Sequence, residues 1–243
     1  MEAVVLAGGL GTRLQSVVSA APKPMAPVAG RPFLEILLES LASGGVRRVV
    51  LSVGHLGHVI SDHFGDRFAG LELDYAVEPS PLGTGGGLRR ALSRVQAAWA
   101  IVANGDTWVE MDLRDLWRRH HLALEADPGL RMSMTLHPVD DARRYGRVAV
   151  EDGRVVRFEA AGAAGPGWIN AGTYLVASDL LADPALPDRF SFEAGFLEPR
   201  LPALRPLAYR VRGRFIDIGV PEDYARAQEL LADRGSPDGS ARP

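Results

Sequence analysis

The residues with the clearest chemical potential lie near the start of the chain, in the segment LAGGLGTRL at 6–14. Three glycines, Gly8, Gly9 and Gly11, follow an apolar run and precede Arg13. A glycine-rich turn after a first strand brings backbone N–H groups close to a phosphate. We therefore expect this loop to bind a phosphorylated ligand, with a plain tight turn as the alternative.

Two familiar phosphate-binding loops do not match this segment. The dinucleotide fingerprint needs a third glycine where Leu14 stands, and an acidic residue at the end of the second strand, at 52–55, where the chain has none. The ATPase loop needs a G-K-[ST] ending, which is also missing. A Rossmann oxidoreductase is therefore disfavoured.

Lys23 is the single lysine among 27 basic residues. A lysine retained among arginines indicates a position that needs a compact ammonium on a flexible stem, with chance as the alternative. Pro22 and Pro24 predict a stiff, extended backbone that holds this ammonium in one direction. Lys23 and Arg13 would together supply two cations for the negative charges of a triphosphate.

A second glycine cluster stands in EPSPLGTGGGLRRAL at 78–92, where it opens an expected helix. Its glycines let a flat group approach the backbone closely. The alternative is a helix start that merely carries small residues.

Asp106 is expected just past a strand at 100–103, and Asp217 near the end of a short strand at 215–218. Ligands bind at the carboxyl edge of open α/β sheets. Two carboxylates suit Mg²⁺, which takes few protein oxygens and completes its octahedron with phosphate oxygens and water. The pair predicts a magnesium site, although each aspartate alone would more simply be a cap or turn residue.

Strands and helices alternate through the first 125 residues, which predicts a mainly parallel sheet with helices on both faces. Apolar spacing predicts strands at 4–6, 48–53, 71–77 and 100–103, and helices at 31–44, 59–64 and 84–95. Short β-like segments at 132–136, 147–150, 154–158 and 169–176 predict mixed or antiparallel strands in a smaller lobe. A last helix is expected from Pro221. His120 and His121 form an adjacent pair on another expected helix, where we expect them to be solvated.

The composition excludes several classes of protein. A hydrophobic fraction of 47% predicts a substantial core, and a net charge of −3 argues against nucleic-acid or membrane partners. The lack of cysteine excludes disulfides and thiolate metal sites. The sequence shows no signal peptide and no apolar run of the roughly 18 residues that a membrane span needs, so we expect a cytoplasmic protein.

Six motifs, in order along residues 1–232, resemble those of the sugar-1-phosphate nucleotidylyltransferases: LAGGLGTRL with PKPM, PLGTGG, NGDT, YG, INAG, and DIG followed by PEDY. The resemblance implies an α/β fold with a Rossmann-like, mainly parallel sheet and a smaller sugar-binding lobe. It also implies attack of a sugar phosphate on the α-phosphorus of a nucleoside triphosphate (NTP). Such transfers depend on positioning and charge neutralisation rather than on a protein nucleophile.

The resemblance implies a role for each matching residue. It makes Arg13, Lys23 and Asp106 the catalytic residues, and it assigns Mg²⁺ binding to Asp106 and Asp217. Nucleotide binding falls to Leu6, Ala7, Gly8, Gly9, Gly11, Thr12, Glu78, Pro81, Gly83, Thr84 and Gly85, and sugar binding to Asn104, Tyr145, Gly146 and Asn170. We expect one domain at 1–234, with a nucleotide-binding half at 1–125, a sugar-binding half at 126–220 and a flexible tail at 235–243. The sequence leaves open whether the chain forms a homo-oligomer.

Glu78 bears on the identity of the base. A glutamate only accepts hydrogen bonds, and guanine presents two neighbouring donors, N1–H and N2–H₂, so Glu78 favours GTP. The phrases RPFLE, EPSPLGTGG and NGDTW are most similar to family members that act on D-glycero-α-D-manno-heptose 1-phosphate. A uridylyl-, adenylyl- or cytidylyltransferase acting on another sugar 1-phosphate is the alternative, since main-chain groups at 83–86 could decide the base instead.

The chain departs from the family at 158–161, which reads FEAA. Members of the family often carry Phe-x-Glu-Lys there, and the lysine binds the sugar phosphate. Either a nearby arginine replaces it, or Glu159 shifts register, or the phosphate is held differently; the arginines are Arg143, Arg144, Arg147 and Arg157. The departure also leaves open a non-catalytic, nucleotide-sugar-binding regulator, against which the retained cations and aspartates argue.

Overall fold

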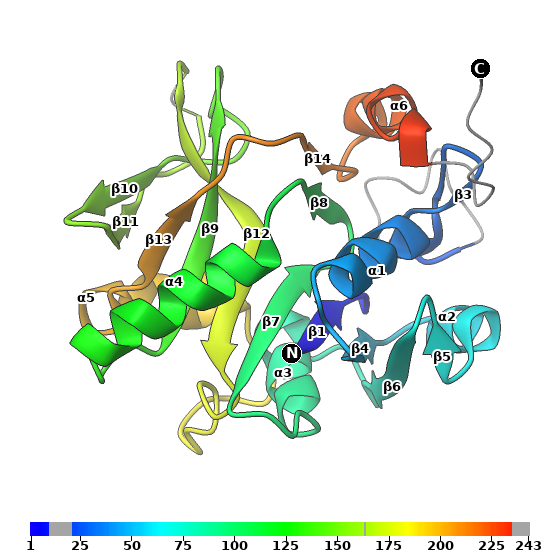
Figure 1. Ribbon diagram of the computed structural model, residues 1–243, viewed down its shortest axis with the longest axis horizontal. Helices are drawn as coiled ribbons and strands as arrows, with labels where there is room; N and C mark the ends of the chain where they lie inside the picture. Colours follow the sequence, from blue (N-terminus) through cyan, green and yellow to red (C-terminus); the bar gives the residue numbers. More distant parts are fainter. Residues whose placement is uncertain (10–20, 163, 235–243) are drawn as a thin grey trace.

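The computed structural model describes residues 1–9, 21–162 and 164–234. Within these ranges, a ten-stranded sheet has the order β10-β11-β13-β9-β12-β7-β1-β4-β6-β5, shown in Figure 1. Two smaller sheets pair β14 with β8 and β2 with β3. Helices cover both faces of the large sheet, which confirms the predicted α/β class. Gly11, Thr12, Arg13 and the tail at 235–243 lie outside the described residues.

The elements of the first half alternate as predicted. The strands are β1 (Glu2–Leu6), β2 (Pro27–Val28), β3 (Arg31–Pro32), β4 (Arg48–Val53), β5 (Arg67–Phe68), β6 (Leu71–Val77), β7 (Trp99–Asn104) and β8 (Thr107–Val109). The helices are the 3₁₀ turn η2 (Lys23–Met25), α1 (Phe33–Ser43), α2 (Gly57–Phe64), α3 (Gly83–Leu92) and α4 (Leu113–Ala126).

The second half is richer in strands. They are β9 (Met132–Val139), β10 (Val148–Glu151), β11 (Arg154–Phe158), β12 (Gly167–Ala177), β13 (Leu207–Arg210) and β14 (Phe215–Asp217). The helices are the π-helix η3 (Phe192–Leu197), α5 (Glu198–Leu204), α6 (Pro221–Leu230) and the 3₁₀ turn η4 (Ala232–Arg234).

The parallel part of the sheet consists of β7, β1, β4 and β6. Alternate residues of β1 point to opposite faces, as they must in a strand. Ala3 and Val5 pack with α1, α2 and α4, whereas Val4 packs with α3, η3 and α5. In Figure 1, α1 and α4 cross in front of the strands. Both faces are thus buried, which explains the continuous apolar runs in these strands.

The second half extends the same sheet with mixed pairing, as predicted. β12 runs antiparallel to both β7 and β9, and β13 enters parallel to β9. The sequence patterns do not predict β8, β13, η3 or α5. Two of these are strands of only three and four residues, and α5 contains Pro202 in its interior, which is a helix-breaking signal.

The expectation that His120 and His121 are solvated is wrong for His120. Its side chain is fully buried, its Nδ1 lies 2.8 Å from Ser133 Oγ, and its ring contacts Trp99 edge to face. His121 is partly buried and stacks on Trp117. Histidine is a polar residue, so no sequence pattern indicates that α4 turns this side chain toward the sheet. None of the helices in the described ranges combines the length and the apolar character that crossing a bilayer requires.

Lowering the pH should destabilise the protein through His120. Burial lowers the pKa of His120 to about 4, with a further contribution from the charges of His121 and Arg154. An unfolded histidine binds its proton near pH 6.5 but the folded one near pH 4, so stability falls across this window by up to about 3 kcal/mol. Urea unfolding at pH 7 and 4.5 should show a smaller loss in His120→Gln than in the wild type.

Leu116→Ala provides the control, because it truncates a fully buried side chain on the same helix without a titrating group. It should lower the free energy of unfolding equally at both pH values. An identical pH response in the wild type and His120→Gln would show that His120 does not contribute.

Candidate active site

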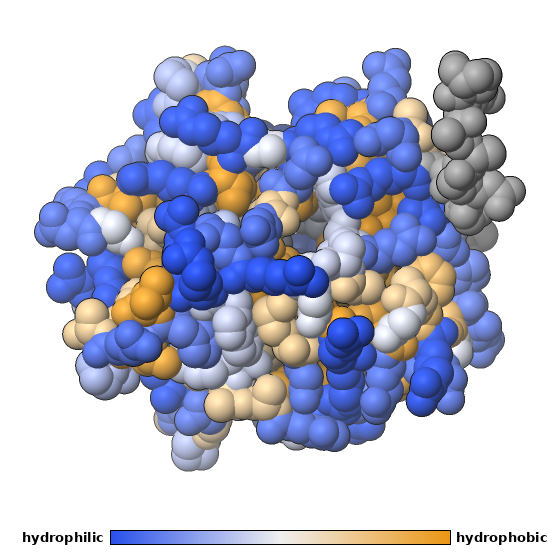
Figure 2. Space-filling model, in the orientation of Figure 1, coloured by the Kyte–Doolittle hydropathy of each residue, from blue (hydrophilic) through white to orange (hydrophobic). Residues whose placement is uncertain are grey.

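A cavity of about 410 Å³ lies at the carboxyl ends of β1, β4 and β7. The surface outline is notched between the tips of β9 and β12 and the helix α6, as Figure 2 shows. The predicted residues that line the cavity are Leu6, Ala7, Gly8, Gly9, Lys23, Glu78, Pro81, Gly83, Thr84, Asn104 and Asp106. Segments far apart in the chain thus converge where ligands bind in open α/β sheets.

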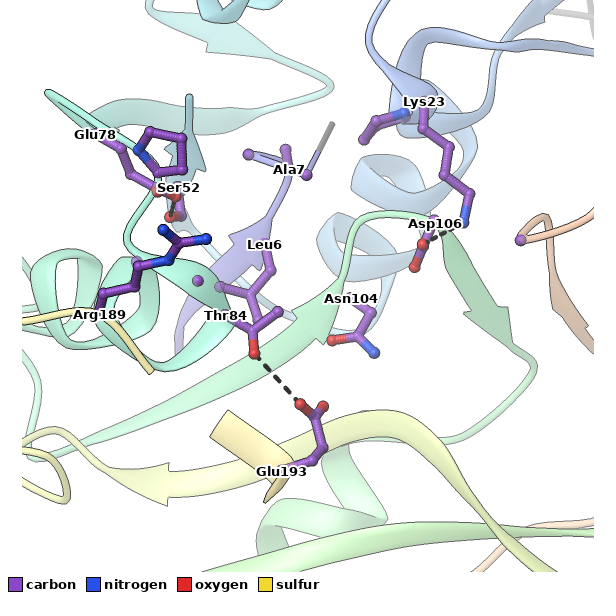
Figure 3. A pocket seen from close by; sticks show the side chains of 17 residues that line it. Leu6, Ala7, Lys23, Ser52, Glu78, Thr84, Asn104, Asp106, Arg189 and Glu193 are labelled. Carbon is purple, nitrogen blue, oxygen red and sulfur yellow. Dashed lines mark hydrogen bonds and ion pairs between the residues drawn. The ribbon is translucent and has the colours of Figure 1, made fainter. Parts of the chain in front are cut away.

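Lys23 lies at one end of this cavity, beside Asp106 (Figure 3). Its Nζ donates to Asp106 Oδ2 at 2.5 Å and lies 3.9 Å from Asp217 Oδ1. The lysine side chain is only 10% exposed. The predicted extended backbone is wrong here, because Lys23–Met25 form a 3₁₀ turn whose closing bond runs from Ala26 N–H to Lys23 O. Pro22 is nevertheless extended and buried, so the turn still starts from a stiff residue.

The two aspartates meet because β8 and β14 pair directly. Asp217 lies opposite Thr107, and Ile218 N–H donates to Asp106 O at 2.9 Å. The loop that carries Asp106 is fixed to β1 by a hydrogen bond from Gly105 N–H to Leu6 O, 2.9 Å long. A Cβ at position 105 would lie 2.7 Å from that same carbonyl oxygen, so only glycine permits this approach.

The charges in this cluster depend on one another. Burial and the negative charge of Asp106 raise the pKa of Asp217, and Lys23 and Arg144 oppose that rise. Two repelling carboxylates around one cation form a donor set that suits a divalent ion. Among the described residues no third Asp, Glu or His joins them. This set fits Mg²⁺, which commonly takes one or two carboxylates together with phosphate oxygens and water.

Glu78 lies at the opposite end of the cavity, next to Ser52 (Figure 3). Its Oε2 accepts a hydrogen bond from Leu82 N–H at 2.9 Å, and its Oε1 lies 3.5 Å from Ser52 Oγ. Glycines flank the carboxylate: a Cβ at Gly8 or Gly87 would lie 2.6 or 2.7 Å from Oε1. Glu78 is therefore a side chain of fixed orientation that faces the ligand space with acceptors only.

Several residues that line the cavity are not among those expected from the sequence: Pro24, Ser52, Gly87, Arg189, Glu193 and Gly219. Arg189 and Glu193 arrive together, because Phe190 pairs through its backbone with Leu82 and Gly85. Thr84 Oγ1 donates to Glu193 Oε2 at 3.3 Å (Figure 3). No local pattern marks this segment, since its place depends entirely on contacts with a distant loop.

Asp217 and several other expected residues are not among those that line the cavity. Gly85 lies beneath the ring of Phe190, where a Cβ would be 2.2 Å from the ring. Asn170 donates to Tyr174 Oη at 2.6 Å and accepts from Gly172 N–H at 3.0 Å. Gly146 has a φ of 75°, a left-handed backbone that favours glycine.

Tyr145 also lies outside the cavity lining. Burial raises its pKa to about 12, so its hydroxyl stays protonated at neutral pH. The guanidinium of Arg144 lies over its ring, 4.4 Å from the centroid.

A family model described as nucleotidyl transferase matches residues 2–234, so the chain belongs to this family. Two relatives are named D-glycero-alpha-D-manno-heptose 1-phosphate guanylyltransferase. The one from Aneurinibacillus thermoaerophilus is 38% identical over 231 residues, which cover 95% of this chain and 98% of the relative. The one from Campylobacter jejuni is 40% identical over 225 residues, which cover 92% and 97%.

A solved structure agrees with these relatives. It is HddC from Yersinia pseudotuberculosis complexed with GMP-PN, which is 37% identical to this chain with a TM-score of 0.80. The similarity covers 95% of this chain and 99% of that chain. The fold is therefore shared over nearly the whole length of both chains.

Removing the Lys23 ammonium should weaken the fold through the two aspartates. Lys23→Met leaves Asp106 and Asp217 to repel each other, whereas the further change Asp106→Asn relieves that repulsion. The double variant should therefore lose about 1–2 kcal/mol less unfolding free energy than the two single variants lose together. Urea unfolding at pH 7 measures these losses. As a control, Lys23→Met and Glu78→Gln at opposite ends of the cavity should be additive within about 0.5 kcal/mol. Additivity in the first pair would contradict the coupling.

Proposed function

We propose that the protein transfers GMP from GTP to D-glycero-α-D-manno-heptose 1-phosphate and releases pyrophosphate. The observation that carries the proposal is the position of Lys23, whose Nζ lies between Asp106 and Asp217 at one end of the cavity. Glu78 lies at the other end, where a base would bind. The names of the two relatives support the same reaction and the same acceptor.

In this reaction an oxygen of the sugar phosphate forms a bond to the α-phosphorus of GTP. The bond from that phosphorus to the bridging oxygen of the β-phosphate breaks, and pyrophosphate leaves. Such a transfer needs positioning and charge neutralisation. Backbone N–H groups of Gly8 and Gly9 would bind the nucleotide, and the Lys23 ammonium would neutralise the α-phosphate and the incoming phosphate. Arg13 is proposed to bind the departing pyrophosphate.

Asp106 and Asp217 would hold Mg²⁺, which when bound supplies positive charge to phosphate oxygens and orients them. Lys23 has a four-carbon stem with rotatable donors, so its ammonium can turn from the carboxylates toward a phosphate. The low exposure of this side chain limits the directions it can take.

Glu78 would recognise guanine. Its oxygens would accept hydrogen bonds from N1–H and N2–H₂, since a carboxylate offers about four lone-pair sites and Leu82 N–H uses one. Because Gly8 and Gly87 carry no side chain, the carboxylate can lie against their backbone, where a Cβ would clash with it. A base that presents an acceptor at the same place would meet an unfavourable acceptor–acceptor contact.

The sugar would bind between Asn104 on β7 and the second half of the chain, near Tyr145, Gly146 and Asn170. We propose that residues 1–234 act as one unit, with 1–125 mainly for the nucleotide and 126–220 mainly for the sugar. The continuous sheet supports a single unit, because β7 of the first half pairs directly with β12 of the second.

Lys23→Ala and Asp106→Ala should each abolish turnover while the fold remains. The first removes the cation at the reacting phosphates, and the second removes one of two metal-binding carboxylates. The measurement is pyrophosphate release with four NTPs and a panel of sugar 1-phosphates, together with circular dichroism. Arg118→Ala, which removes an exposed cation on α4, is the matched control and should keep wild-type rates. Near-normal rates in either site variant would overturn these assignments.

Glu78→Gln should erode the preference for GTP. The amide places a donor where guanine needs an acceptor, so kcat/KM for GTP relative to ATP and UTP should fall by about tenfold or more. Glu72→Gln, which changes an exposed residue on β6, the strand that ends just before Glu78, should leave the preference unchanged. The same nucleotide selectivity in both variants would remove Glu78 from base recognition.

A further inference from the structure

Four arginines lie near the segment at 158–161, and the structure separates them by what each one contacts. Arg143 pairs with Asp141 at 3.1 Å, and its side chain is 63% exposed. Arg157 pairs with Glu159 at 3.0 Å and is equally exposed. Both are surface cations whose partners lie within two positions in the sequence, so neither reaches the carboxylate cluster.

Arg147 is held by its own half of the chain. Its guanidinium donates to Ala164 O at 2.5 Å and lies 4.0 Å from Glu159. A Cβ at Gly167 would lie 2.8 Å from its stem, so the side chain is packed against this loop. Arg147 therefore stabilises the loop rather than facing the site.

Arg144 differs because it reaches Asp217. Its Nη2 donates to Asp217 Oδ2 at 3.2 Å, while Lys23 Nζ lies 3.9 Å from the other oxygen of the same carboxylate. Two cations from distant segments thus flank one carboxylate. Arg144 is the member of the four that joins the second half of the chain to the proposed reaction centre.

The surroundings of Arg144 hold the guanidinium in place and leave part of it accessible. Its Nη1 donates to the buried carboxylate of Asp223 on α6, and its plane lies over Tyr145. These two hydrogen bonds use two of the five donors that a guanidinium carries. The side chain remains 37% exposed. The guanidinium is therefore oriented, and its other three donors have no hydrogen-bond partner among the described residues.

A sugar 1-phosphate brings an anion to this junction. Arginine suits such an anion because its planar fork donates two parallel hydrogen bonds to phosphate oxygens. We propose that Arg144 binds the phosphate of the acceptor sugar 1-phosphate, with Asp223 and Tyr145 fixing its orientation. This inference rests on the proposed function and names the residue that recognises the acceptor's charge.

The test separates acceptor binding from every other effect. In Arg144→Ala the KM for the sugar 1-phosphate should rise about tenfold or more, as expected for the loss of a hydrogen bond to a charged group, and the KM for GTP should stay within about twofold. Titration calorimetry of the sugar 1-phosphate, with a non-hydrolysable GTP analogue present, should show the same loss of affinity. Arg144→Lys should recover only part of it, because an ammonium lacks the fork.

Arg143→Ala is the matched control, since it removes the neighbouring but surface-paired cation and should keep wild-type constants. Thermal unfolding checks that each variant folds. If Arg144→Ala does not fold, the same measurements on Arg144→Lys provide the test. A fall in kcat with an unchanged KM for the sugar 1-phosphate would overturn the proposal, because it would mean that Arg144 only positions Asp217.

Failure of the proposed function can be distinguished from failure of the Arg144 proposal. It would appear as a lack of pyrophosphate release by the wild type with any NTP and sugar 1-phosphate. Calorimetry would still compare the affinity of the wild type and of Arg144→Ala for the sugar 1-phosphate. Equal affinities would reject the role of Arg144.

Discussion

The attraction between one ammonium group and two carboxylates is the interaction on which the site depends. Lys23 comes from a 3₁₀ turn, Asp106 from the loop after β7, and Asp217 from β14. Brought together without a cation, the carboxylates would repel each other; burial, and after it the negative charge of Asp106, raise the pKa of Asp217. Lys23 and Arg144 counter that repulsion from two sides, so the cluster is held ready for the more highly charged phosphates and metal that we propose.

The sheet can present this cluster because its main chains approach one another closely. Gly105 lies against the carbonyl of Leu6, and Gly8 and Gly87 lie against Glu78. At each place a Cβ would come within 2.7 Å of an oxygen. The glycines therefore do two things: they leave backbone N–H groups accessible to a ligand, and they make room for the Glu78 carboxylate and for the loop that carries Asp106.

Local patterns predicted the elements best where both faces of a strand are buried. The runs in β1, β4 and β7 are continuous and apolar, and the helices between them have clear spacing. Prediction failed where a distant contact overrides local preference. Lys23–Met25 turn although prolines flank the lysine, His120 is buried although it is polar, and α5 continues through Pro202 because it packs on the core.

The sequence by itself determined the kind of chemistry: a glycine loop, a lone lysine, two strand-end aspartates and an acceptor-only Glu78. These signals are local, because they depend on residue type and spacing within a few positions. Only the tertiary structure decided which of them meet. It paired Asp217 with Asp106 through β8 and β14, brought Arg189 and Glu193 into the cavity, and singled out Arg144. Such contacts depend on strand order and register, which no short segment encodes.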